Sequence, residues 1–237
     1  MPNWCMNTIL ISGPSEDVSV LYKSLEEYDA EIMSKEKEPG TNPFTICSWI
    51  ESKFSDKLPT FTEDDYALSY RNFIEDYIYY YSEEDADDKE AHLDIYTYSA
   101  WTSRMYALVK LIEVGFPKCI IHYVSEEPGF DYFINTDESG YYFQEKWCYR
   151  NRFKSVYCIS SDEDMYKTLI NDYADIIKDN NIVIPALVNP GLYQICELVK
   201  TLVEYDKKLY VYPFSIGHEY DDKNVEILKG ITGKAAE

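Results

Sequence analysis

The order of apolar patterns along the first 124 residues constrains the fold more than any other feature of this sequence. Apolar residues alternate or run together in four short segments, as in strands, and recur every three or four positions in two longer segments, as in helices. In chain order, the predicted elements are a strand at 7–12, a helix at 15–31, strands at 44–50 and 92–98, a helix at 105–112 and a strand at 119–124. This β-α-β-β-α-β order predicts an α+β protein with a ferredoxin-like N-terminal domain.

An acidic segment lies between the second and third predicted strands. Thr62 precedes three acidic residues, and the apolar residues from Tyr70 to Tyr81 have helical spacing, so we predict a helix that begins at Thr62. The ferredoxin-like domain is expected to span 1–150, with an acidic helical insertion at about 51–91. Residues 151–237 contain further strand and helix patterns, and we expect them to form an additional C-terminal α+β part.

Composition excludes several classes of function. The chain has 43 Asp and Glu against 22 Lys and Arg, a formal charge of −21, so we expect no basic face for nucleic acid or for an anionic membrane. No apolar run reaches the roughly 18 residues of a membrane-spanning helix. The first residues lack the basic and apolar regions of a signal peptide, and no cysteines form a C-x-x-C pair. We therefore expect a cytoplasmic protein with reduced thiols.

Motifs that carry catalysis are missing from the sequence. His92, His122 and His218 are far apart, there is no G-x-S-x-G nucleophile motif, and none of the nine glycines belongs to a phosphate-binding loop. The acidic run also lacks the glycine of a calcium-binding loop. We therefore predict a non-enzymatic protein with no catalytic residue, no metal site and no cofactor.

Nearly half of the net charge is concentrated in residues 61–96, which hold twelve acidic and two basic residues. Neighbouring carboxylates repel one another, so the cluster costs stability. One interpretation is a solvated face that ends in an acidic loop. The other is a nucleic-acid mimic, in which carboxylates take the places of phosphates on a basic partner and tyrosines add contact area. The predicted partner-binding residues are Glu63, Asp64, Asp65, Asp76, Tyr79, Tyr80, Glu83, Glu84, Asp85, Asp87, Asp88 and Glu90.

Three short motifs add a family resemblance. They are Pro2-Asn3-Trp4-Cys5 with Asn7 and Gly13-Pro14, then Ser99-Ala100-Trp101, and then Glu127-Pro128-Gly129 with Phe130. Together they resemble the YubB ferredoxin-like family, which is found in proteins of phages and plasmids. The resemblance implies the fold and a mobile-element origin, and it implies no catalytic residues. The family's second, Trp-rich strand is not visible before His92.

These observations lead to one main functional expectation. It is a non-enzymatic acidic inhibitor from a mobile element, which binds the basic surface of a nucleic-acid-handling host defence protein, such as a CRISPR effector, by nucleic-acid mimicry. The first alternative is a structural or assembly protein of a phage or plasmid system with incidental acidity. The second is an enzyme that acts on a small cationic substrate in an acidic cleft. The sequence leaves the oligomeric state open.

Overall fold

The computed structural model describes residues 4–34, 44–57, 71–81, 90–100, 102–127, 132–152, 154–185 and 189–216. The chain is a mixed α+β protein that divides into two compact units, Met1–Tyr132 and Phe133–Glu237. The division falls before residue 150, the domain boundary expected from the sequence.

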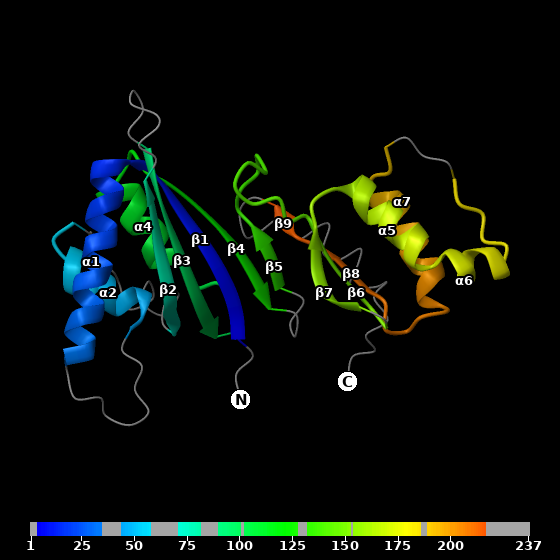
Figure 1. The fold of residues 1–237 in the computed structure, drawn as a ribbon, viewed down its shortest axis with the longest axis horizontal. Coiled ribbons are helices and arrows are strands. Elements are labelled where there is room, and N and C mark those ends of the chain that lie inside the picture. The colour runs from blue at the N-terminus through cyan, green and yellow to red at the C-terminus, as the bar shows by residue number, and fades with distance from the viewer. Residues whose placement is uncertain are drawn as a thin grey trace. The chain divides into compact units, whose positions relative to one another are not determined.

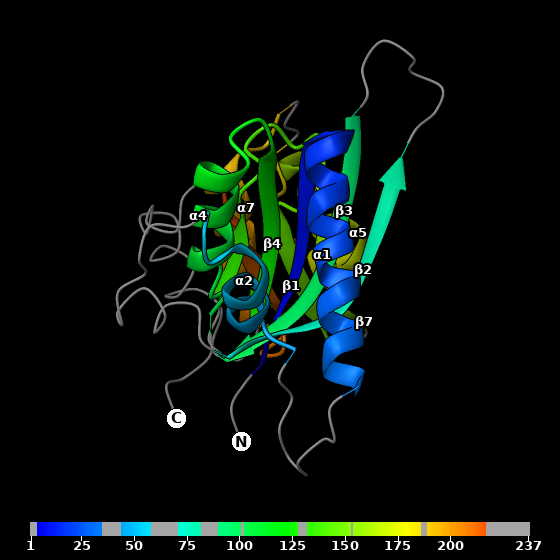
Figure 2. The same ribbon diagram turned by 90° about the vertical axis from the view of Figure 1, so that its left-hand side faces the viewer.

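The first unit is an antiparallel sheet with helices on one face. Its described elements are β1 (Trp4–Pro14), α1 (Ser15–Ser34), α2 (Ile46–Phe54), β2 (Asn72–Tyr81), β3 (Glu90–Ala100), α4 (Tyr106–Gly115) and β4 (Ile120–Glu127). The strand order is β2-β3-β1-β4, and each neighbouring pair is antiparallel. Figures 1 and 2 show α1, α2 and α4 on the same side of this sheet. The opposite side is called the outer face below.

Alternation along β1 explains how the sheet and helices pack. Ile9 and Ile11 are fully buried toward the helices, while Trp4 and Met6 are exposed on the outer face. Helix α1 begins with Glu16 and Asp17 in its first turn, where carboxylates suit the helix dipole. The residues of its apolar stripe are buried, as their helical periodicity predicted.

The strand predicted at 44–50 is wrong, because this segment forms helix α2. The hydroxyl of Thr45 accepts a hydrogen bond from the Ser48 backbone N–H at 3.1 Å, which is the N-cap that starts the helix. Trp49 is fully buried, and its indole N–H donates to Ser24 Oγ at 3.0 Å. Tertiary packing thus overrides the strand preference of the aromatic and β-branched residues.

The helix predicted to continue to Tyr81 is also wrong in its described part, where residues 72–81 form strand β2. A β-bulge between Ile74 and Asp76 inserts Glu75 into the pairing with β3. Because of the extra residue, the side chains directed to the helices are Ile74, then Tyr77 and Tyr79, so the spacing changes from three to two. This irregular spacing resembles a helical stripe. The part of the predicted helix at 62–70 lies outside the described residues.

The second unit places helices against a small sheet. Its elements are β5 (Tyr132–Asn135), β6 (Trp147–Asn151), β7 (Lys154–Ile159), α5 (Asp162–Asp172), α6 (Ala174–Asp179), α7 (Leu192–Val203), β8 (Tyr210–Pro213) and β9 (Ser215–Ile216). Strands β7, β6 and β8 form an antiparallel sheet in that order, and β5 pairs with β9 in parallel. Trp147 and Tyr149 of β6 pack with buried residues of α5 and α7 in one core. The second unit therefore combines strands and helices, and it begins at Phe133.

Candidate protein-binding face on the β2–β3 hairpin

The charge on the strands of the first unit is of one sign. Strands β1 to β4 contain six acidic residues and no lysine or arginine. Asp76 and Glu90 are exposed, while Asp94 and Glu126 are partly buried. No ion pair between described residues includes Asp76, Glu90 or Asp94, whereas Glu31 of α1, for example, pairs with Lys53. The charges of Asp76, Glu90 and Asp94 are therefore not neutralised by ion pairs with the described cations.

The β2–β3 register places these carboxylates among aromatic side chains. Asp76 lies opposite Tyr96, and Tyr80 lies opposite His92. Such cross-strand neighbours have Cβ atoms about 4.5–5.5 Å apart, so their side chains share one surface. The outer face of the hairpin thus alternates acidic and aromatic groups.

Three aromatic rings meet at the end of this face. Trp4 packs edge-on against Phe73 and Tyr98, with centroid distances of 5.8 Å and 5.2 Å. Phe73 stacks on Tyr98 at 5.4 Å. Trp4 nevertheless remains 42% exposed, so the cluster offers an aromatic surface beside the carboxylates. Aromatic rings of this kind attract arginine and lysine side chains.

Asp94 has the most unusual environment on the face. It lies between Ile78 of β2 and Leu10 of β1, and its buried Oδ1 atom has no hydrogen-bond partner among the described residues. Burial raises the pKa of Asp94 above its usual range, although the charge of nearby His92 acts in the opposite direction. A carboxylate held in this way is incompletely solvated. A cationic hydrogen-bond donor from a partner would therefore stabilise it.

The structure separates the predicted partner-binding residues into three groups. Asp76, Glu90 and Tyr80 are exposed, and Asp76 and Tyr80 lie on the outer face of the hairpin. Tyr79 points to the helix side and stacks on Tyr22 of α1 at 5.1 Å. The remaining predicted residues lie outside the described residues: Glu63, Asp64, Asp65, Glu83, Glu84, Asp85, Asp87 and Asp88.

Five residues of the last group belong to the connection between β2 and β3. This connection consists of residues 82–89, outside the described residues, and it joins two strands that are paired up to Tyr81 and Ala91.

Sequence reasoning missed several residues of the face. Trp4, Phe73, Asp94, Tyr96 and Tyr98 were not predicted to bind a partner. The alternation at 92–98 does place Asp94, Tyr96 and Tyr98 on one face of a strand. Their proximity to Trp4 and Phe73 depends on strand pairing over long sequence separations, for which the sequence contains no local signal.

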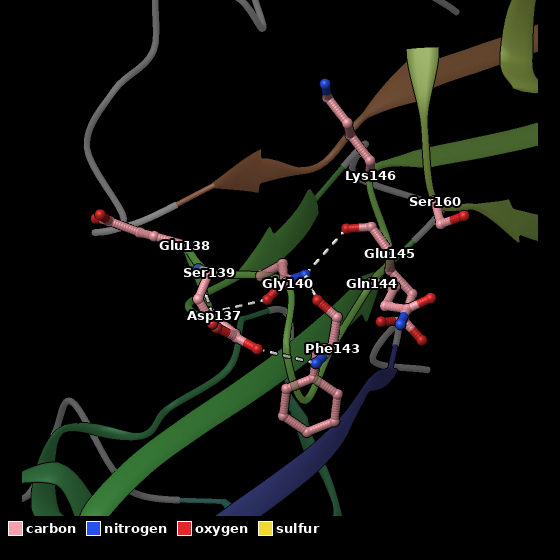
Figure 3. Close-up of a pocket in the computed structure, with 10 residues that line it drawn as sticks. Asp137, Glu138, Ser139, Gly140, Phe143, Gln144, Glu145, Lys146 and Ser160 are labelled. Carbon is pink, nitrogen blue, oxygen red and sulfur yellow. Dashed lines mark hydrogen bonds between the residues drawn. The ribbon is translucent and has the colours of Figure 1, made fainter. Parts of the chain in front are cut away.

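A separate polar pocket in the second unit has a volume of about 410 Å³ (Figure 3). Its wall is a loop held by Asp137, whose buried carboxylate accepts hydrogen bonds from the backbone N–H groups of Tyr142 at 2.6 Å and Phe143 at 3.0 Å. The Asn135 amide donates to two backbone carbonyls of the same loop, those of Phe143 and Glu145. These hydrogen bonds stabilise the loop, so they explain both polar side chains without a ligand.

The described part of the chain contains no group of three His, Cys, Asp or Glu residues suited to a metal ion. Five of its six cysteines are buried. No described helix combines the length and the apolar character needed to cross a bilayer. No family model matches the chain, and searches of curated proteins and of solved structures give no significant match. The geometry defines an α+β protein with an acidic and aromatic sheet face.

Proposed function

We propose that the chain is a non-enzymatic binding protein of mobile-element origin. In this proposal it inhibits a nucleic-acid-handling host defence protein, such as a CRISPR effector, by binding its basic surface. We also propose that the first unit is a ferredoxin-like domain of the YubB type. The antiparallel order β2-β3-β1-β4, with helices on one face, supports this assignment of the fold, and the motifs around Trp4, Ala100 and Glu127 support the family.

The observation that carries the functional proposal is the uncompensated charge of the β2–β3 hairpin. Asp76, Glu90 and Asp94 take part in no ion pair between described residues, and the connection between β2 and β3 adds five more carboxylates to the sequence. Charge of one sign attracts a surface of the opposite sign and speeds association with it. The adjoining tyrosine and tryptophan rings are residue types that contribute strongly to protein interfaces.

The spacing of the sheet supports mimicry in a form that differs from the predicted helical ladder. On the outer face, Asp76 and Asp94 are diagonal cross-strand neighbours, about 7–8 Å apart. This is close to twice the roughly 3.4 Å rise per phosphate along one strand of a duplex. These carboxylates can therefore meet lysine and arginine side chains that are arranged for every second phosphate.

The proposal is tested by displacement of nucleic acid from purified defence nucleases. Labelled DNA is bound to each nuclease, and the fluorescence anisotropy is followed as the protein is added. The test variant neutralises the hairpin connection by changing Asp85, Asp87 and Asp88 to Asn. The matched control changes Asp175 and Asp179 to Asn and Glu204 to Gln, which are exposed acids of the second unit. Both variants raise the net charge equally.

We expect the wild type and the control to displace the DNA equally well and the hairpin variant to do so much less well. The affinity for the nuclease should fall steeply between about 0.05 M and 0.5 M salt, because exposed charges are screened. Equal losses in the two variants would contradict the proposed location of the binding surface. Displacement that does not depend on salt would contradict the electrostatic mechanism.

A further inference from the structure

Strand β2 forms one edge of the described sheet, and no described strand lies along most of that edge. On one side β2 pairs with β3. On the other side, Phe73 forms a bridge with Thr45, and the Ile74 N–H donates to the Phe44 carbonyl at 2.9 Å. From Glu75 to Tyr81, no described segment pairs with this outer edge. Figure 2 shows β2 at the border of the sheet, beyond β3.

An unpaired strand edge presents N–H and C=O groups to any chain that can add to the sheet. Natural proteins block such edges with charged residues, especially lysine, with proline, with β-bulges or with very short strands. Strand β2 has ten residues and contains neither lysine nor proline, and its bulge and its two acidic residues are confined to one end of the unpaired segment, at Glu75 and Asp76. Residues 77–81 of β2 are all tyrosine or isoleucine, which favour strands. Two of them are partly exposed: Ile78 is 37% exposed and Tyr80 is 49% exposed. The edge is therefore chemically suited to accept another strand.

Charge indicates which kind of strand the edge accepts. Glu75 and Asp76 lie at one end of the unpaired segment, and the acidic connection at 82–89 follows its other end. On the helix side, Tyr22 donates a hydrogen bond to Glu26 at 2.8 Å. Burial raises the pKa of Tyr77 to about 12, and the negative charges of Asp29 and Glu26 contribute to this shift. A second copy of this chain would bring the same negative charges together and be repelled. A positively charged strand would be attracted.

We propose that an extended segment of a partner protein, bearing lysine or arginine at alternate positions, adds to the sheet along residues 75–81 of β2. The backbone hydrogen bonds of the added strand provide affinity. Its basic side chains on the outer face lie beside Asp76 and Tyr80 and supply specificity. This inference rests on the proposed function, because it names the chemistry of the partner segment and its mode of binding.

The test uses a peptide in which lysine and valine alternate. A second peptide carries the same lysines but has two inner valines replaced by proline, which prevents strand pairing. A third has glutamate in place of every lysine. Each is titrated into the isotopically labelled full-length protein, and backbone amide shifts and hydrogen exchange are recorded by NMR. We expect the lysine-valine peptide to bind about tenfold more tightly than the proline peptide and to slow exchange within 75–81.

Two variants of the protein locate the binding edge. Ile78→Lys places a positive charge on the edge strand, and Met6→Lys places the same charge on β1, where Met6 is 67% exposed on the same face. We expect Ile78→Lys to weaken binding of the lysine-valine peptide much more than Met6→Lys does. Equal weakening would overturn edge pairing, because it would show that only the total charge of the face matters.

The peptides separate the failure of this inference from the failure of the proposed function. Equal binding of the lysine-valine and proline peptides would overturn strand addition but leave a basic partner in place. Binding of the glutamate peptide as tightly as the lysine-valine peptide would contradict both. Slowed exchange at 75–81 that depends on protein concentration without peptide would show that a second copy occupies the edge, which would also overturn the inference.

Discussion

Replacing Asp94 with asparagine should stabilise the first unit, although it removes a charged residue from a native strand. Asp94 is partly buried between Ile78 and Leu10, and its buried Oδ1 has no hydrogen-bond partner among the described residues. Burial is more costly for a charged group than for a neutral polar one. Asparagine still places a polar atom at this position but removes the charge, and part of the side chain contacts water, so the gain in unfolding free energy should be about 1 kcal/mol. Asparagine keeps the shape of the side chain, so packing changes little.

The pH dependence of this gain has a definite sign. Burial raises the folded-state pKa of Asp94 above its ordinary value of 3.8. The folded state is therefore penalised when the carboxylate is charged, and the penalty disappears once it is protonated in both the folded and unfolded states. Asp94→Asn should stabilise the protein at neutral pH, and its advantage should shrink as the pH falls to 3.8 and below.

Native-state hydrogen exchange at Ile9, Leu93 and Ile95 would measure this gain, because these buried amides open with the sheet of the first unit. Asp76→Asn is the control. Asp76 is exposed, so this change should leave exchange unaltered. Faster exchange in Asp94→Asn at neutral pH would refute this prediction. An effect on exchange that is the same at pH 7 and in acid would also refute it.

Three further predictions concern packing and hydrogen bonding. Gly13→Ala should lower the unfolding free energy by about 1–3 kcal/mol, because the new Cβ would lie 2.9 Å from Cys119 Cα. Gly140→Ala has open space around the new Cβ but a φ of +67°, so it should cost only about 1 kcal/mol. Urea denaturation that ranks the two variants in the opposite order would contradict this prediction. Tyr79→Ala should lower the unfolding free energy by about 1–2 kcal/mol, because it removes the stacking on Tyr22, while Tyr80→Ala should leave stability unchanged but weaken partner binding. Thermal unfolding and the displacement assay check this pair of variants. A loss of binding confined to Tyr79→Ala would contradict binding through the outer face. Tyr173→Phe should destabilise the second unit by about 1.5–3 kcal/mol, because the Tyr173 hydroxyl donates a hydrogen bond to buried Asp206 at 2.6 Å. Burial alone would raise the pKa of Asp206, but this hydrogen bond and those from backbone N–H groups lower it, so the loss of stability should shrink as the pH falls below 3.8. A loss that stays constant in urea titrations across that pH range would contradict this prediction.

The sequence predicted those strands whose alternation is uninterrupted. Strands β1 and β3 alternate between buried and outward side chains along most of their length, and both were expected close to where they occur. Strand β2 was predicted as a helix because the bulge at Glu75 breaks the two-residue period. Helix α2 was predicted as a strand because Phe44 and Ile46 favour strands locally, and the capping contact of Thr45 was not recognised.

The candidate site was predictable only in its charge. Counting residues reveals the acidic segment at 61–96, and the sequence therefore indicated a basic partner. The aromatic part of the face was not predictable in this way, because Trp4 and Tyr98 are brought together by the β1–β3 register. The unpartnered oxygen of Asp94 is likewise a consequence of its position between two strands.

The binding face can be mapped by a hydrogen-exchange footprint of the protein bound to a defence nuclease whose DNA it displaces. We expect slowed exchange in the backbone amides of 72–81 and 90–98, with little change in α5 and α7. We also expect this protection to be lost when salt dissociates the complex. A footprint confined to the second unit, with β2 and β3 exchanging as in the free protein, would contradict binding through this face.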